Sequence, residues 1–189
     1  MTPRAEPAPN WDRLFEIAVG QEGHFTTRQG AQAGYSPQLL LKYLKNGRIV
    51  RVRRGVYRIV HFPAGEHEDL ATLWLWSGQE GVFSYETALM LHNLSDVLPR
   101  KAHLTLPTAW AKRRLRVPKG VVLHHGDVPK AERAEMGAVP VTSVLRTLCD
   151  CVDAHVSPEF IDAAVRLARA RGLISNEDLK VIRARRRAA

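Results

Sequence analysis

Amide and cationic side chains recur along one stretch of the sequence, at spacings that suit contact with a nucleic acid. Gln38, Lys42 and Lys45 stand at i, i+4 and i+7, which places them on one face of a helix. Residues 22–62 hold eight Lys or Arg and one acid, and residues 28–62 contain no Asp or Glu. This concentration of positive charge points to a polyanion as the partner or to a solvated basic face, and charge alone favours neither.

We expect these side chains to divide between the bases and the phosphates of double-stranded DNA. A glutamine can bond adenine and a lysine can reach guanine O6 and N7, whereas cations at or past a helix end meet phosphate. Arginines at a hairpin tip are expected to enter the minor groove, which is the role predicted for Arg53 and Arg54. The predicted DNA-binding residues are Thr27, Arg28, Ser36, Gln38, Lys42, Lys45, Arg48, Arg51, Arg53 and Arg54.

Two short helices are predicted ahead of this face. Asn10 is a good N-cap for a helix over residues 11–19, and residues 24–26 form a short extended piece. Thr27 is then expected to cap a second helix over residues 28–33, which stops at a glycine. The start of this second helix is placed to meet a backbone phosphate.

The helix that carries the glutamine and the lysines has a sharp start signal. Ser36 followed by proline supplies a capping hydroxyl and a fixed φ, and the pattern predicts a helix over residues 37–46. Leu40, Leu41 and Leu44 are expected to share its buried face and to pack against the two earlier helices. The opposite face is then free to enter a groove of DNA.

A basic hairpin follows, with strands predicted over residues 48–52 and 56–60 around an Arg-Arg-Gly turn at 53–55. Three helices followed by such a hairpin indicate a winged helix-turn-helix domain over residues 10–62. Some winged helices serve protein contact instead. The absence of acids from residue 28 to residue 62 favours DNA.

A second domain is expected beyond the Pro-Ala-Gly break at 63–65. The whole chain is predicted to be α+β: a disordered lead-in at 1–9, the winged helix-turn-helix, and a small α+β domain over 66–189. In this last domain we expect helices over 66–77, 85–92, 143–152, 158–172 and from 175 on, and strands over 102–107, 121–125 and 138–141.

A second basic stretch lies inside that domain. Residues 100–119 hold seven Lys or Arg and no acid. The stretch is either a second DNA surface or a solvated loop between two strands, and charge alone favours neither. The residues that would form the second surface are Lys112, Arg113, Arg114 and Arg116.

No catalytic site, metal site or cofactor is expected. The carboxylates are dispersed and no strand carries a Glu-x-Lys, so a nuclease centre is not indicated. Asp150 and Asp153 share a helix face, which solvation of a helix end explains. Cys149 and Cys151 are expected in or beside the core, and neighbouring His124 and His125 point to opposite faces of a strand.

The location expected for the protein is the cytoplasm. No apolar run approaches the roughly 20 residues that a membrane helix needs, so no membrane contact is expected. Residues 1–9 lack the apolar stretch of a secretion signal, and two cysteines cannot build a disulfide framework.

Several motifs together resemble a known family. In the first domain they are residues 35–37 (YSP), 43–49 (YLKNGRI) and 51–57 (RVRRGVY). In the second they are 84–89 (SYETAL) with His92, 103–107 (HLTLP), 139–143 (VPVTS) and 146–148 (RTL). With these motifs the sequence resembles the AbiEi-type antitoxins of type IV abortive-infection toxin–antitoxin systems, over nearly the whole chain after the lead-in.

The resemblance implies a repressor that controls its own operon and offsets a co-encoded nucleotidyltransferase toxin. It also implies that the second domain serves antitoxin activity and cooperative DNA binding. We expect a monomer that binds cooperatively to inverted repeats, because no coiled coil or apolar dimer helix is visible. The alternative is an orphan nucleic-acid-binding protein whose second domain binds RNA or processes nucleic acid.

Overall fold

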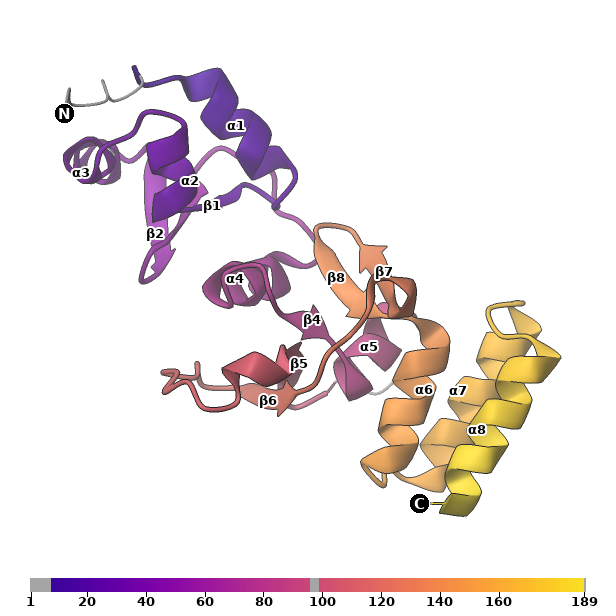
Figure 1. Cartoon of the computed structure of the whole chain (residues 1–189). Helices are drawn as coiled ribbons and strands as arrows, with labels where there is room; N and C mark the ends of the chain where they lie inside the picture. Colours follow the sequence, from indigo (N-terminus) through magenta and orange to yellow (C-terminus); the bar gives the residue numbers. More distant parts are fainter. Residues whose placement is uncertain (1–7, 96–98, 189) are drawn as a thin grey trace. The chain divides into compact units, whose positions relative to one another are not determined.

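The computed structural model describes residues 8–95 and 99–188 (Figure 1). The predicted disordered lead-in falls almost wholly on residues 1–7, outside the described part. By its contacts the chain divides into two units: residues 1–79 with 137–139, and residues 80–136 with 140–189. No helix in the described ranges is long and apolar enough to cross a membrane.

The first unit opens with α1 (Trp11–Val19), β1 (His24–Thr26) and α2 (Thr27–Gln32). Asn10 caps α1 as predicted, its Oδ1 accepting from the Arg13 N–H at 2.9 Å. The cap of α2 is Thr26 and not Thr27 as predicted. The Thr26 hydroxyl accepts from the Gln29 N–H while the Gln29 side chain accepts from the Thr26 N–H, a reciprocal capping box that Thr27 has no partner to form.

The predicted third helix is α3 (Pro37–Lys45), and Ser36 caps it by accepting from the Leu39 N–H at 3.3 Å. The aromatic rings of α1 and α3 hold it in place. Tyr43 stacks on Trp11 with ring centroids 5.7 Å apart and meets Tyr35 edge-on at 5.3 Å. Leu14, Phe25, Leu40 and Ile49 complete the core of this unit.

The basic hairpin consists of β2 (Ile49–Arg53) and β3 (Val56–Ile59), which join β1 in an antiparallel sheet of order β1-β3-β2. A register shift lies between Arg51 and Arg53, and Gly55 supplies a φ of +77° at the turn. Helices α1, α2 and α3 followed by this wing confirm the predicted winged helix-turn-helix.

A fourth helix, α4 (Glu68–Trp76), also belongs to the first unit. The Arg58 guanidinium on β3 donates to the Glu68 carboxylate at 2.6 Å and to the Phe62 carbonyl at 2.9 Å. The Glu22 carboxylate accepts from the His67 N–H at 3.1 Å. The structure therefore divides the chain near Gln79, whereas the sequence suggested the break at 63–65.

The second unit is built on a five-stranded sheet of order β6-β5-β4-β8-β7. β4 runs antiparallel to β5 and parallel to β8, and β5 runs parallel to β6. The predicted strands at 102–107, 121–125 and 138–141 are confirmed, whereas β4 and β7 were not predicted. The strands are β4 (Val82–Phe83), β5 (Ala102–Leu106), β6 (Val121–His125), β7 (Arg133–Met136) and β8 (Val139–Thr142).

Helices of the second unit share an apolar core that includes Leu148, Cys151 and Ile182. The buried cysteines agree with the prediction. α6 contacts α5, α7 and α8, so it is the centre of this helical layer. The helices are α5 (Tyr85–Leu91), α6 (Val144–Asp153), α7 (Pro158–Ala170) and α8 (Asn176–Ala188), with short 3-10 turns η1 (Thr108–Trp110) and η2 (Lys130–Glu132).

Candidate nucleic-acid interface

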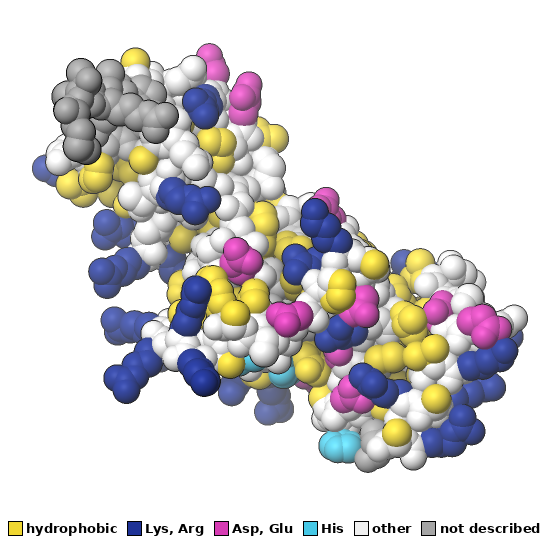
Figure 2. All heavy atoms as spheres, in the orientation of Figure 1, with side chains coloured by type: hydrophobic (Ala, Val, Ile, Leu, Met, Phe, Trp, Pro, Cys, Tyr) yellow, Lys and Arg dark blue, Asp and Glu magenta, His cyan; other side chains and the backbone are white. Residues whose placement is uncertain are grey.

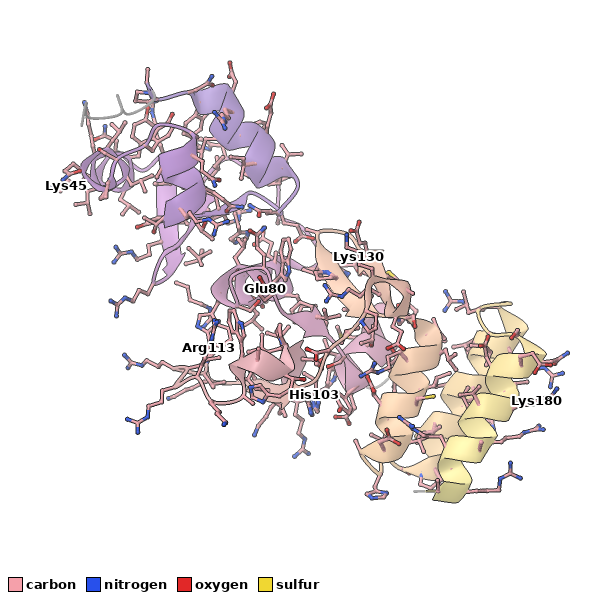
Figure 3. The ribbon with its side chains drawn as sticks, in the orientation of Figure 1. Lys45, Glu80, His103, Arg113, Lys130 and Lys180 are labelled. Carbon is pink, nitrogen blue, oxygen red and sulfur yellow. The ribbon has the colours of Figure 1, made fainter. Side chains whose placement is uncertain are left out.

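The outer face of α3 is the surface that the sequence predicted for base contact. Gln38, Lys42 and Lys45 are all exposed on it, and Figure 3 shows Lys45 at the end of the helix. Leu40 is 1% exposed and anchors the opposite face. None of the three polar side chains has an ion pair within the described part of the chain.

The buried face of α3 differs from the prediction at one residue. Leu41 is 51% exposed, whereas Leu39, Tyr43 and Leu44 pack against the core beside Leu40. With Tyr43 stacked on Trp11, residues 39, 40, 43 and 44 face the core, so Leu41 lies on the outer face next to Gln38. The expectation that Leu41 packs against the earlier helices is wrong for this reason.

Two arginines just beyond α3 are ordered by aromatic rings. The Arg48 guanidinium carbon lies 5.3 Å from the centroid of Tyr43, and that of Arg51 lies 5.8 Å from the centroid of Tyr57. Both arginines are exposed. A guanidinium over an aromatic face keeps its edge N–H groups free for phosphate oxygens and loses less side-chain freedom on binding.

The turn at the wing tip is shorter than the sequence suggested. Arg53 is the last residue of β2, paired across the hairpin with Val56, so the turn consists of Arg54 and Gly55. Arg54 is exposed, whereas Arg53 is half-buried and its Nε is buried without a hydrogen-bond partner among the described residues. Arg54 is therefore the freer of the two predicted wing arginines.

The start of α2 lies against the wing. The Thr27 N–H donates to the Gly55 carbonyl at 3.0 Å, and its hydroxyl donates to the same oxygen at 3.4 Å. Arg28 next to it is exposed. The structure thus brings Arg28 beside the wing turn, while the hydroxyls of Thr27 and Ser36 already serve the wing and the α3 cap.

Charge on this unit is unevenly distributed. Figure 2 shows Lys and Arg side chains along the hairpin, and both acidic and basic side chains over α1. Arg58, the remaining arginine of the wing sheet, is engaged with Glu68 and is only 15% exposed. Apart from Arg13 on α1, the exposed Lys and Arg side chains in the described part of this unit belong to α2, α3, the loop after α3 and the wing.

Residues 12–60 match the family model described as transcriptional regulator, AbiEi antitoxin. These residues form an AbiEi-type regulator domain. The resemblance drawn from the sequence motifs is confirmed for this segment, and the matched family is one of transcriptional regulators and antitoxins. The interface described above lies wholly within the AbiEi-type domain.

Solved structures support the fold of the whole chain. The RV2827C protein from Mycobacterium tuberculosis is similar with a TM-score of 0.51 and 16% identity, over 94% of this chain and 72% of that protein. At that identity the likeness concerns the fold alone. No curated protein matches the chain significantly.

The second predicted surface, Lys112, Arg113, Arg114 and Arg116, lies in the second unit between η1 and β6, and all four residues are exposed. The Arg113 guanidinium lies 4.0 Å from the centroid of Trp110 (Figure 3). The segment is an exposed loop in which one arginine lies over an aromatic ring, and its role as a second DNA surface stays a prediction.

The carboxylates and thiols weighed for catalysis have structural partners. Asp150 is buried and accepts from Arg146 Nε at 2.7 Å, and Asp153 pairs with Arg185 at 2.9 Å. Solvation of a helix end is therefore the wrong explanation for Asp150, which is 8% exposed in an ion pair. Burial raises the pKa of Cys149 and Cys151, so both remain thiols at neutral pH.

A cluster that the sequence did not reveal surrounds β5 and β6. His103 Nε2 lies 3.1 Å from the Glu86 carboxylate, and His103 Nδ1 lies 3.0 Å from His124 Nε2. Tyr85 stacks on His124 with ring centroids 3.8 Å apart. If Glu86 accepts from Nε2–H of His103, then Nδ1 accepts from His124, and both rings are neutral.

This cluster predicts acid sensitivity of the second unit. Burial, and then the neighbouring His103, lowers the pKa of His124 to about 4, below the 6.5 of an exposed histidine. The unfolded chain binds this proton more tightly than the folded chain does. The free energy of unfolding is therefore highest above about pH 7 and decreases as the pH falls from 6.5 to 4. We expect the lowered pKa of His124 to reduce the free energy of unfolding by about 2 kcal/mol at pH 5.

The measurement is the urea midpoint at pH 7 and pH 5 for the wild type and for His124→Phe, which keeps a ring against Tyr85 but cannot titrate. We expect the variant to lose about half or more of the acid-induced decrease, while lowered pKa values at His24, His92 and His103 leave a remainder. His125→Phe, at the exposed neighbour on β6, is the control. An unchanged decrease in His124→Phe would contradict the assignment.

Proposed function

We propose that this protein is a repressor that binds double-stranded DNA upstream of its own operon through the outer face of α3. The observation that carries the proposal is that face itself: Gln38, Lys42 and Lys45 are exposed side by side, without ion pairs among the described residues, on a rigidly packed helix. The major groove, about 12 Å wide, admits a helix of this kind.

In this arrangement the predicted contacts fall into two classes. Gln38 and Lys42 address base edges, as amide and ammonium groups do with adenine and guanine. Lys45, Arg48 and Arg51 address phosphates on one side of the groove, and Arg28 does so on the other. Arg54 at the wing tip enters the adjacent minor groove, and the half-buried Arg53 supports it.

The partner in the operon is proposed to be a nucleotidyltransferase toxin, which this protein offsets as an antitoxin. The support is the AbiEi-type domain at residues 12–60 together with the motifs of the second unit. Loss of growth on deletion of this gene alone, and recovery on deletion of a downstream nucleotidyltransferase gene as well, tests the pairing.

The basic loop of the second unit is proposed as a second DNA surface. Lys112, Arg113, Arg114 and Arg116 are exposed, and no acid lies between residues 100 and 119. Such a loop adds phosphate contacts without sequence information, which suits cooperative occupancy of inverted repeats by monomers. RNA binding by the same loop is the competing function, because Trp110 with Arg113 offers an aromatic surface for bases.

The test is a titration of the full chain against its own upstream duplex, a scrambled duplex and a single-stranded RNA of equal length, at two salt concentrations. We expect a preference for the upstream duplex of about 10³-fold or more and a steep loss of affinity with salt. Equal affinity for the two duplexes would contradict the repressor proposal. Preferential binding of the RNA would favour the competing function.

A further inference from the structure

An exposed leucine lies on the polar face of α3, at its edge. Exposed residues Gln38, Leu41, Lys42 and Lys45 follow one another at i, i+3, i+4 and i+7, so they form a single stripe. Leu41 is 51% exposed, whereas Leu40 one residue earlier is 1% exposed. The leucine is therefore presented by the same face that carries the amide and the ammonium groups.

Single exposed leucines are common on proteins and by themselves mean little. The position of Leu41 sets it apart, because it is flanked by Gln38 one turn before it and by Lys42 directly after it. At 1.5 Å of rise per residue, the three side chains span about 6 Å along the helix, less than two base-pair steps. Side chains this close together would reach neighbouring base pairs if α3 entered a groove.

The major groove offers one apolar group, the C5 methyl of thymine. We propose that Leu41 determines specificity by packing its methyl groups against a thymine methyl, next to the base pairs that Gln38 and Lys42 contact. This inference rests on the proposed function, since it requires α3 to enter the groove. The adjacent cations fit DNA better than an apolar protein partner, because residues 28–62 contain no acid.

The experiment removes the methyl group from the DNA. The full chain first selects duplexes from a randomised pool, and the selected duplex is then made with thymine or with uracil, which lacks only that methyl. Each contacted thymine is expected to lose about fourfold in affinity, the value of one buried methyl group. Leu41→Ala should bind the two duplexes equally, at about the affinity that the wild type has for uracil.

Val19→Ala is the matched control, because Val19 is 52% exposed on α1 and lies outside the stripe. It should keep the full difference between thymine and uracil, and all variants should unfold at the wild-type midpoint. Selection of a duplex with no response to uracil overturns this inference and leaves the repressor proposal standing, as does a response that persists in Leu41→Ala. Selection of no duplex at all overturns both.

Discussion

Replacing Lys42 by alanine is expected to raise the Kd for the selected duplex by about tenfold to a hundredfold, because a lysine on guanine O6 and N7 contributes about 1–3 kcal/mol of discrimination. Lys42 is exposed at the centre of α3 and has no ion pair among the described residues. Affinity for a scrambled duplex should fall much less, because the loss of one positive charge affects both duplexes whereas the base contact is lost only in the selected one. Fluorescence anisotropy with both duplexes measures the ratio.

Lys180→Ala is the control of equal charge. Lys180 lies on α8 of the second unit, pairs with Glu177 at 2.8 Å and is 71% exposed. It should leave both affinities within about twofold of the wild type, because Lys180 belongs to neither proposed DNA surface and its charge is already paired with Glu177. A loss in Lys42→Ala that is the same for both duplexes would contradict base contact and would reassign Lys42 to a phosphate.

Replacing Arg146 by alanine is expected to cost the second unit about 3 kcal/mol of unfolding free energy. Arg146 donates to the Asp150 carboxylate at 2.7 Å and also pairs with Glu132. Burial raises the pKa of Asp150 even beside this guanidinium, so the carboxylate would be left buried without its counter-charge. Hydrogen exchange of the α6 amides in increasing urea measures the change.

A second change should restore much of the loss. Arg146→Met combined with Asp150→Asn removes both charges, and we expect it to recover at least half of the lost free energy. Arg185→Ala breaks the more exposed pair with Asp153, 51% and 44% exposed, and should cost less than about 1 kcal/mol. An equal and small loss of unfolding free energy in Arg146→Ala and Arg185→Ala would contradict this prediction. It would mean that burial of Asp150 does not make the loss of its partner more costly.

Local signals in the sequence were sufficient for most of the fold. Ser36 followed by Pro37 located the start of α3 to the residue, because a hydroxyl cap and a fixed φ act within one turn. Asn10 did the same for α1. The strands β5, β6 and β8 were found because each contains apolar residues over four or five positions, several of them β-branched in β6 and β8. The two-residue β4 and the charged β7 carry no such pattern, and only pairing with their neighbours makes them strands.

The incorrect predictions in the candidate site arose where residues of the same type are adjacent in the sequence. Residues 39–41 are three consecutive leucines, so hydrophobicity alone does not fix which of them face inward. The aromatic contacts of Tyr43 decide it, and they depend on Trp11, 32 positions earlier in the chain. Thr26 and Thr27 pose a similar choice, for which Gln29 three residues after Thr26 was an available signal.

Side-chain clusters were beyond reach of the sequence for another reason. Glu86, His103 and His124 come from α5, β5 and β6, and no spacing in the sequence links them. The pairing of Ala102 with Val121 sets the register that brings the two histidines together. Arg58 likewise looked like any other wing arginine until α4 placed Glu68 against it.

The Arg58–Glu68 pair also bears on where the first unit can be cut and fused to another domain. A fusion that joins residues 10–62 to a foreign effector would carry the whole winged helix, yet it would strip α4 from β1 and β3 and leave the Arg58 guanidinium without its carboxylate. A natural recombination event with its crossover at the Pro-Ala-Gly break would remove the same contacts. The first unit extends to Gln79, so we expect a chimera that keeps α4 to be more stable than one cut at residue 62.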